Sequence, residues 1–256
     1  MRTRKRYPTD LTDTQWEQLK RLLPQKRTSD EKAREYINAI LYGLRTGGSW
    51  AMLPHDFPNF ETVKTYFYKL RRDGTWQRIN DVLREQVRSA SGHESEPSLL
   101  ILDSQSVKTT EKRGARGYDG GKRVKGRKRH IVVDSQGWLV RVLVHPANWA
   151  DSDGAKHLLK RVPLYRRWTK LLLDGGYDSP ALLHWCTYLF NIDAEIVRRS
   201  DLKRFVVLPK RWIVERTFAW LGKYRRLSKD YEYLPAVSEA WVYVAMIDRM
   251  LHRLCP

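Results

Sequence analysis

The stretches SLLILDS (98–104) and TKLLLDGGYD (169–178) decide the fold class. Each is a short apolar run that leads directly into a carboxylate, Asp103 in the first and Asp174 in the second. Such runs are typical of buried strands. A buried strand holds the side chain at its end rigidly at the sheet edge, where functional groups are commonly mounted. We therefore predict that both aspartates end strands and that they converge if those strands are neighbours.

The segments around these two strands predict a mixed sheet. RHIVVDSQGWLVRVLVHP (129–146) has two β-branched runs around the turn DSQG, which is typical of a hairpin. AEIVRR (194–199) predicts a further short strand. Helical patterns occupy 152–161, 180–190, 211–227 and 238–254. Strands interspersed with helices indicate an α/β fold, with a mixed sheet covered by helices on both faces.

The first 92 residues are predicted to be helical throughout. Thr12 and Gln15 have capping-box spacing ahead of one helix, and Asn59 caps another that closes at Gly74. Two more helices fit 30–45 and the apolar stripe that begins at Trp76. We expect a helical domain at 1–92, a polar linker at 93–98 and a second domain at 99–256.

The charge balance points to a nucleic acid as the partner. Lys and Arg number 48 against 29 Asp and Glu, which gives a formal net charge of +19. Such an excess favours a polyanion. The apolar runs are far shorter than the roughly 20 residues that span a bilayer, and the N-terminus lacks a secretion signal, so no membrane is expected. The two cysteines have no zinc-ligand or disulfide pattern.

The two aspartates suggest a metal site if they converge. Adjacent carboxylates repel each other and need a proton or a cation between them. Oxygen ligands favour Mg²⁺ or Mn²⁺. The alternative is that each aspartate merely caps the next element. Glu215 also has two interpretations, because Arg211 lies four residues before it and the two could form an ordinary intrahelical ion pair.

A resemblance adds to this reading. The chain resembles DDE-superfamily transposases of bacterial insertion sequences, specifically the insertion-sequence-five-like group. The motifs that carry it are LDSQSVK (102–108), GYDGGKRVKGRKRH (117–130), ANWADSDG (147–154), LLLDGGYD (171–178) and RWIVERTFAWLGKYRRLSKDYE (211–232). The resemblance implies a ribonuclease-H-like fold whose catalytic carboxylates are Asp103, Asp174 and Glu215. It also implies that these three bind two Mg²⁺ (or Mn²⁺) ions, with Asp103 bridging both.

The last motif departs from the pattern Tyr-x2-Arg-x3-Glu-x6-Lys of the wider superfamily. Arg211 and Glu215 match it, whereas Leu208 stands at the Tyr position and Gly222 at the Lys position. Lys223 or Arg226 could take the place of the Lys at a DNA phosphate. Arg211 and Lys223 are therefore expected to contact DNA.

Two further segments are expected to contact DNA. The resemblance implies that the N-terminal helices form a small DNA-binding domain for the terminal inverted repeats. Helix-turn-helix geometry would place the 59–72 helix of this domain in a major groove. Residues 108–130 carry ten Lys or Arg against two acids, which predicts a flexible arm on DNA phosphates. The alternatives are a solvated helix face and a solvated, disordered loop. The predicted DNA-binding residues are Lys64, Thr65, Tyr68, Arg71, Lys122, Arg123, Lys125, Arg127, Lys128 and Arg129.

The function implied is cleavage of phosphodiester bonds at element ends, followed by joining of the 3′-hydroxyls to target DNA. Two rival functions remain, a metal-dependent nuclease without joining and a transposase-derived DNA-binding regulator. We expect double-stranded DNA as partner, a homodimer or larger assembly on DNA, and a location in the bacterial cytoplasm at the nucleoid. His130, His145 and His184 have no ligand spacing, so no role is predicted for them.

Overall fold

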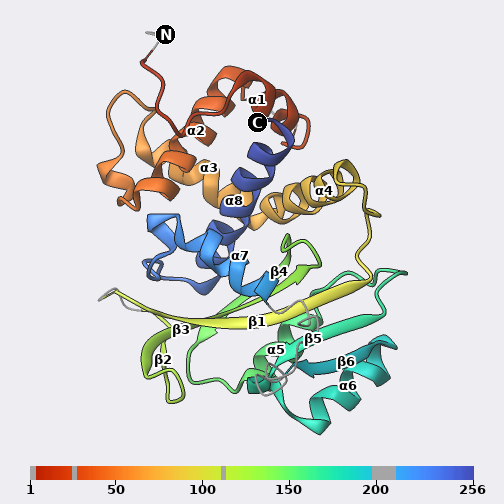
Figure 1. Ribbon diagram of the computed structural model, residues 1–256. Helices are drawn as coiled ribbons and strands as arrows, with labels where there is room; N and C mark the ends of the chain where they lie inside the picture. Colours follow the sequence, from red (N-terminus) through yellow and green to blue (C-terminus); the bar gives the residue numbers. More distant parts are fainter. Residues whose placement is uncertain (1–3, 25–27, 111–113, 198–211) are drawn as a thin grey trace.

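A computed structural model describes residues 4–24, 28–110, 114–197 and 212–256. Helices lie above the sheet, and α5 and α6 lie below it (Figure 1). No helix among these residues is both long and apolar enough to cross a bilayer. The helices are α1 (Asp13–Lys20), α2 (Asp30–Thr46), α3 (Phe60–Arg72), α4 (Thr75–Ala90), α5 (Asp151–Leu159), α6 (Pro180–Phe190), α7 (Trp212–Gly222) and α8 (Pro235–Leu254).

The sheet has six strands and mixed pairing. Strand β1 lies at its centre, antiparallel to β3 on one side and parallel to β5 on the other. Strand β6 extends the parallel half beyond β5, whereas β2 and β4 both pair with the far edge of β3. The strands are β1 (Leu99–Lys108), β2 (Gly117–Asp119), β3 (Val124–Asp134), β4 (Leu139–Pro146), β5 (Lys170–Asp174) and β6 (Asp193–Val197). The α/β prediction of a mixed sheet flanked by helices is confirmed.

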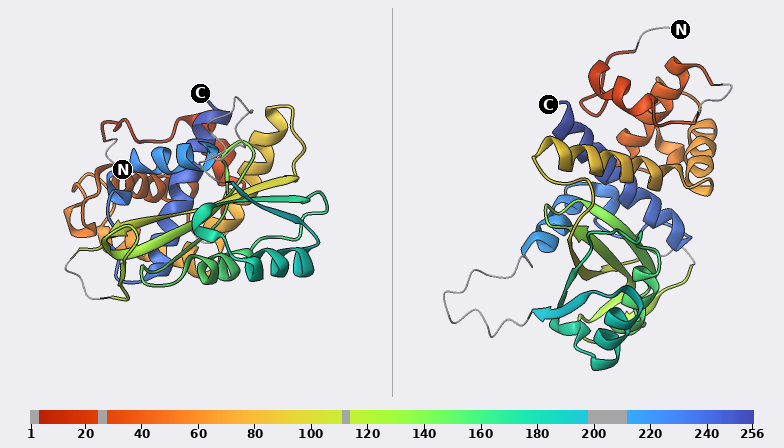
Figure 2. Two further views of the ribbon diagram at one scale, coloured as in Figure 1. Left: turned by 60° about the horizontal axis from the view of Figure 1, so that its bottom comes forward. Right: turned by 90° about the vertical axis from the view of Figure 1, so that its right-hand side faces the viewer.

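The two faces of the sheet pack against different helices (Figure 2). Side chains alternate along β1, so Leu100 and Leu102 join the core that α5 and α6 cover. Ile101 points the other way, into the core that contains Ile213 and Val214 of α7. This alternation determines which face each polar residue of β1 occupies.

Helix α8 joins the N-terminal helices to the sheet region. Trp241 of α8 is fully buried and stacks on Phe67 of α3, with ring centroids 4.5 Å apart. The same hydrophobic core also contains Ile79 of α4 and Val142 of β4. Residues from both sides of the predicted linker at 93–98 thus contribute to one core. The division of the chain into two domains at this linker stays a prediction.

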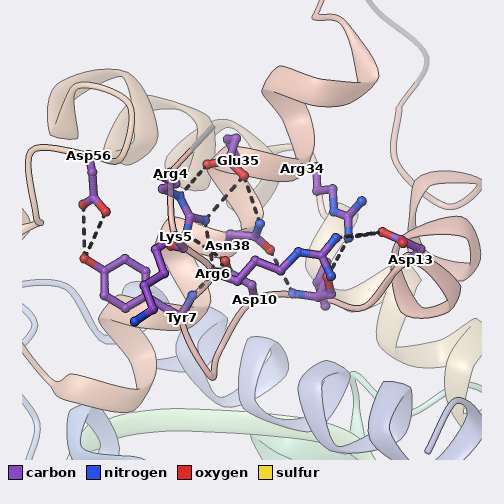
Figure 3. Close-up of polar contacts among 11 residues, drawn as sticks. Arg4, Lys5, Arg6, Tyr7, Asp10, Asp13, Arg34, Glu35, Asn38 and Asp56 are labelled. Carbon is purple, nitrogen blue, oxygen red and sulfur yellow. Dashed lines mark hydrogen bonds and ion pairs between the residues drawn. The ribbon is translucent and has the colours of Figure 1, made fainter. Parts of the chain in front are cut away.

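Polar contacts hold the segment before α1 against α2 (Figure 3). Arg4 donates to Asp10 at 2.7 Å and to Glu35 at 2.8 Å, and its guanidinium lies 4.2 Å from the centroid of the Phe57 ring. The Asn38 side chain accepts from the Leu11 amide at 3.0 Å. These contacts are internal, so the segment is part of the folded unit.

Local signals are confirmed at several element ends. Thr12 and Gln15 form the expected capping box, and the Asn59 side chain accepts from the Glu61 amide at 2.9 Å. Gly47 ends α2 in the left-handed conformation, with φ of 76°. In the hairpin turn, Asp134 accepts from the amides of Gln136 and Trp138.

Two predicted strand boundaries are wrong, and the helix predicted at 211–227 ends at Gly222. Strand β1 does not end at Asp103 but continues to Lys108, because β3 pairs with it over that whole length. For the same reason 124–130 is not a flexible arm but the first half of β3. Pairing between strands decides both strand boundaries. The sequence did not predict them, because the end of β1 and residues 124–130 lack the apolar composition by which a buried strand is recognised.

Candidate active site

Asp103 and Asp174 occupy neighbouring positions on parallel strands. Leu102 of β1 is paired with Leu173 of β5, so the next residues along the two strands are the two aspartates. Alternation places Asp103 on the face of Ile101 and Asp174 on the face of Leu172. Both of these apolar residues belong to the core that α7 covers. The two carboxylates therefore lie on one face of the sheet, as the sequence predicts if the strands are neighbours.

The local roles of the two aspartates differ. Asp174 caps the 3-10 turn η2 (Gly175–Tyr177), since its Oδ1 accepts from the Gly176 amide at 2.9 Å. Asp103 is 9% exposed and lies inside β1, where its Oδ1 accepts from the Ser104 amide at 2.6 Å. The capping alternative thus describes Asp174 but not Asp103.

Glu215 lies on the helix that covers these aspartates. Ile213 and Val214 of α7 are buried against the β1 face that carries Asp103, whereas Glu215 is exposed. In the described part of the chain, no three His, Cys, Asp or Glu side chains are close enough to hold one metal ion. The structure thus brings two carboxylates together and places the third on the adjacent helix. Arg211 lies outside the described residues, so its ion pair with Glu215 and its DNA contact stay untested.

The donor set fits a hard divalent cation. Two carboxylates on adjacent strands offer oxygen ligands from rigid elements, the type that Mg²⁺ and Mn²⁺ prefer. A Cβ at Gly175 would meet no atom within 4 Å, so there is open space beside Asp174. Asp103 and Asp174 could hold the ion, and Glu215 could supply a ligand from α7.

A cluster of aromatic and histidine side chains next to Asp174 escaped the sequence analysis. Tyr177 Oη lies 2.8 Å from His130 Nδ1, and the His130 ring stacks on His145 with centroids 4.9 Å apart. His145 in turn stacks on Trp149 at 4.6 Å. The hairpin register could have revealed the pair, because Lys128 faces His145 and the next residue on that face is His130.

Burial controls the protonation of this cluster. It lowers the pKa of His130 and of His145, so both imidazoles are held neutral. Burial, with the charge of Asp103 as a second cause, raises the pKa of Tyr177 well above its ordinary value. Gly154 lies so close that a Cβ there would be 2.5 Å from His130 Nε2 and 2.8 Å from His145 Nε2. The cluster is therefore tightly packed and uncharged, on the sheet face that α5 covers.

The predicted DNA contacts of Arg127 and Arg129 need correction. Arg127 is 1% exposed, and it donates to Asp230 at 3.1 Å and to the Tyr233 carbonyl at 2.7 Å. Arg129 is equally buried and donates to the carbonyls of Leu227 and Lys229. Both guanidiniums are used internally, because they join β3 to the chain before α8. They are not surface cations available to DNA.

Lys128 and Lys122 are also engaged internally. Lys128 is 4% exposed and its Nζ lies 2.8 Å from Asp151 Oδ1. Lys122 is exposed as a residue, but its Nζ donates to the Ser104 carbonyl at 2.8 Å. Arg123, in the turn between β2 and β3, and Lys125, at the start of β3, are exposed, and no internal hydrogen bond or ion pair of either side chain is seen among the described residues.

The predicted recognition helix α3 presents its expected face outward. Its apolar residues Val63, Phe67 and Leu70 are fully buried. Thr65, Tyr68 and Arg71 line a shallow pocket on the other side, together with Tyr233 and Leu234. Lys64 is half-exposed and forms an ion pair with Glu61 at 2.8 Å. Lys223 is exposed just beyond the end of α7.

Comparisons with known proteins agree with this arrangement. Residues 94–247 match the family described as "Transposase DDE domain", and residues 11–80 match the family described as "Putative transposase of IS4/5 family". A similar protein is "Uncharacterized protein y4sN" of Sinorhizobium fredii, 28% identical over 44% of this chain and 87% of that protein. Another is "Putative transposase for insertion sequence element IS402" of Burkholderia cepacia, 30% identical over 42% of this chain and 54% of that protein.

The first match spans the sheet, Asp103, Asp174 and Glu215, and most of α8. The family consists of nucleic-acid-cleaving enzymes that generally use divalent metals and act on DNA. The resemblance seen in the sequence motifs is confirmed. This chain belongs to the transposase DDE domain family, as an insertion-sequence transposase of the DDE superfamily.

Proposed function

We propose that this chain binds the terminal inverted repeats of an insertion sequence, cleaves phosphodiester bonds at its ends and joins the 3′-hydroxyls to target DNA. One observation carries the proposal. Asp103 and Asp174 are neighbours on the sheet face that α7 covers, and α7 carries Glu215. The family makes DNA the substrate, and this arrangement supports a carboxylate-based site for phosphoryl transfer.

The three carboxylates are assigned as ligands of two Mg²⁺ or Mn²⁺ ions. When bound, such ions lower the pKa of a water and neutralise charge on the leaving oxygen. The chain provides the rigid placement, because Asp103 and Asp174 project from paired strands. Direct attack by water or by a 3′-hydroxyl needs no covalent enzyme intermediate, so no serine or tyrosine nucleophile is required.

Electrostatics give this assignment a test that does not depend on catalysis. Without cations, carboxylates at the site repel DNA phosphates. In EDTA, Asp103→Asn and Asp174→Asn are therefore expected to bind duplex DNA more tightly than the parent. Adding Ca²⁺ should strengthen binding by the parent more than by either variant. The opposite order would contradict a cation site at these two residues.

Catalysis is tested with DNA that carries the element's own ends. The parent, Asp103→Asn, Asp174→Asn and Glu215→Gln are incubated with this DNA in Mg²⁺ or Mn²⁺, and nicking and joining are resolved on gels. Asp153→Asn is the matched control, because Asp153 is an exposed carboxylate in the first turn of α5 that is not assigned as a metal ligand. We expect the parent and the control to cut and join, and the three variants to bind the ends without cutting.

Other outcomes identify the rival functions. Cutting without joining would make the protein a metal-dependent nuclease. Binding of the ends without cutting in either metal would make it a DNA-binding regulator. Activity that survives Glu215→Gln would leave that residue with an ion pair as its role. Since two ends must be brought together, we also expect a homodimer or larger assembly on DNA.

A further inference from the structure

A basic groove lies between α7 and the C-terminal half of α8. Two adjoining hollows share Trp138, Arg249 and Arg253, so they form one continuous surface. We call this surface the α7–α8 groove. Its charged and aromatic lining includes Arg45, Trp212, Arg216, Lys223, Arg249 and Arg253.

The cations of the α7–α8 groove outnumber the carboxylates in its described lining. Among the described residues, none of the five Arg and Lys side chains named above forms an ion pair. The one acid in the described lining is Asp248, which accepts from Tyr224 Oη at 2.7 Å. Burial raises its pKa, whereas the charges of Arg45 and Arg249 lower it, so this single carboxylate offsets only part of the positive charge. Elsewhere in the structure, buried arginines are neutralised by aspartates, as Arg88 is by Asp134 at 2.8 Å. The groove therefore carries an excess of positive charge, with five Arg or Lys side chains against one carboxylate.

Two of these cations are held close together. The guanidinium carbons of Arg216 and Arg249 lie 4.8 and 4.4 Å from the centroid of the same Trp220 ring. Burial and the charge of Arg249 both lower the pKa of Arg216. Cation–π contacts offset part of the repulsion. An anion in the groove would offset the rest.

Helix ends explain only part of the cluster. Arg45 and Arg253 lie in the last turns of α2 and α8, where the helix dipole favours a cation. That argument does not apply to Arg216, which lies in the first half of α7. Trp212 next to it is 52% exposed and stacks on the Arg216 guanidinium at 4.6 Å. The Arg216 guanidinium also donates to the Gln136 carbonyl at 2.7 Å, a contact that joins α7 to the hairpin turn and holds this cation at the groove.

We propose that the α7–α8 groove binds the phosphate backbone of double-stranded DNA that extends beyond the catalytic carboxylates. This inference rests on the proposed function, because Glu215 is on the same helix and Arg216 projects about 100° around the helix from it. From Trp212 to Lys223 the lining extends about 16 Å along the helix axis. Duplex DNA carries about one phosphate per 1.7 Å of its axis, so a stretch of that length supplies several anions.

The test measures binding of a fluorescein-labelled 30-base-pair duplex of arbitrary sequence in EDTA, as a function of salt. Arg45→Ala with Arg253→Ala removes two exposed cations of the groove. Lys156→Ala with Lys160→Ala is the matched control, because these lysines lie at the C-terminal end of α5 and have no ion pair in the described structure. Each phosphate contact contributes about 0.9 to the slope of log affinity against log salt, so the groove variant should lose about 1.8.

We expect the control slope to match the parent, and Arg45→Lys with Arg253→Lys to restore most of the loss. An unchanged slope in the alanine groove variant would overturn the proposal, as would an equal loss in the control. A single-stranded 30-mer that binds more tightly than the duplex, and loses that binding on Trp212→Ala, would overturn the assignment to duplex DNA. The measurement is of DNA binding and does not require cleavage. Its result can therefore be interpreted even if the catalytic proposal fails.

Discussion

Replacing Arg127 by Met tests whether this residue stabilises the fold or binds DNA. The side chain is 1% exposed, and it donates to Asp230, to the carbonyls of Glu232 and Tyr233, and to the carbonyl of Ala115. Asp230 is itself 2% exposed, so the substitution leaves a buried carboxylate without its cation.

The expected cost follows from this burial. Removing one partner of a buried ion pair costs about 3–5 kcal/mol, because the other charge stays buried and uncompensated. Three carbonyls also lose a donor. For a chain of this length about 1 kcal/mol corresponds to a fall of about 2–4 °C in Tm, so Tm should fall by about 10 °C. Arg127→Met with Asp230→Asn should recover part of the loss, since the buried charge is then removed.

Urea unfolding followed by tryptophan fluorescence measures the free energy of unfolding. The salt dependence of duplex binding shows whether Arg127 contacts a DNA phosphate. We expect a large loss of stability and an unchanged salt slope for the folded protein. The reasoning is refuted if Arg127→Met unfolds within about 1 kcal/mol of the parent while the salt slope falls by about 0.9. That result would restore Arg127 as a phosphate contact.

Three more predictions concern the core and the cluster at His130. Burial lowers the pKa of His130 in the folded chain, so its contribution to stability is complete above the unfolded pKa of about 6.5 and is lost as pH falls below it. Between pH 7.5 and 5.5, the free energy of unfolding in urea should therefore fall more for the parent than for His130→Gln. Equal falls would contradict a buried neutral imidazole. Gly154→Ala should cost about 1–3 kcal/mol by overpacking, measured the same way, whereas Gly120→Ala, where a Cβ meets nothing within 4 Å, should cost far less. Circular dichroism and fluorescence should report one coincident unfolding transition, because Trp241 lies in a core shared by α3, α4 and the sheet; two separated transitions would support independent domains at 1–92 and 99–256.

Local sequence determined much of this protein. The helix caps, the hairpin turn and the buried runs before Asp103 and Asp174 each depend on interactions within a few residues, and they form as predicted. The proximity of the two aspartates required only that two apolar strands pair in parallel, which burial of both faces favours.

Only the tertiary structure decided which cations are surface charges. Lys125 and Arg127 are alike in sequence, yet one is exposed and the other is buried against Asp230, a residue 103 positions away. His130 likewise meets Tyr177 from another element 47 positions away. A charge in a sequence shows that a partner is needed, but whether that partner is water, DNA or a distant carboxylate depends on which strands pair. That is why the arm predicted at 108–130 proved to be half strand, and why the groove between α7 and α8 is visible only in the fold.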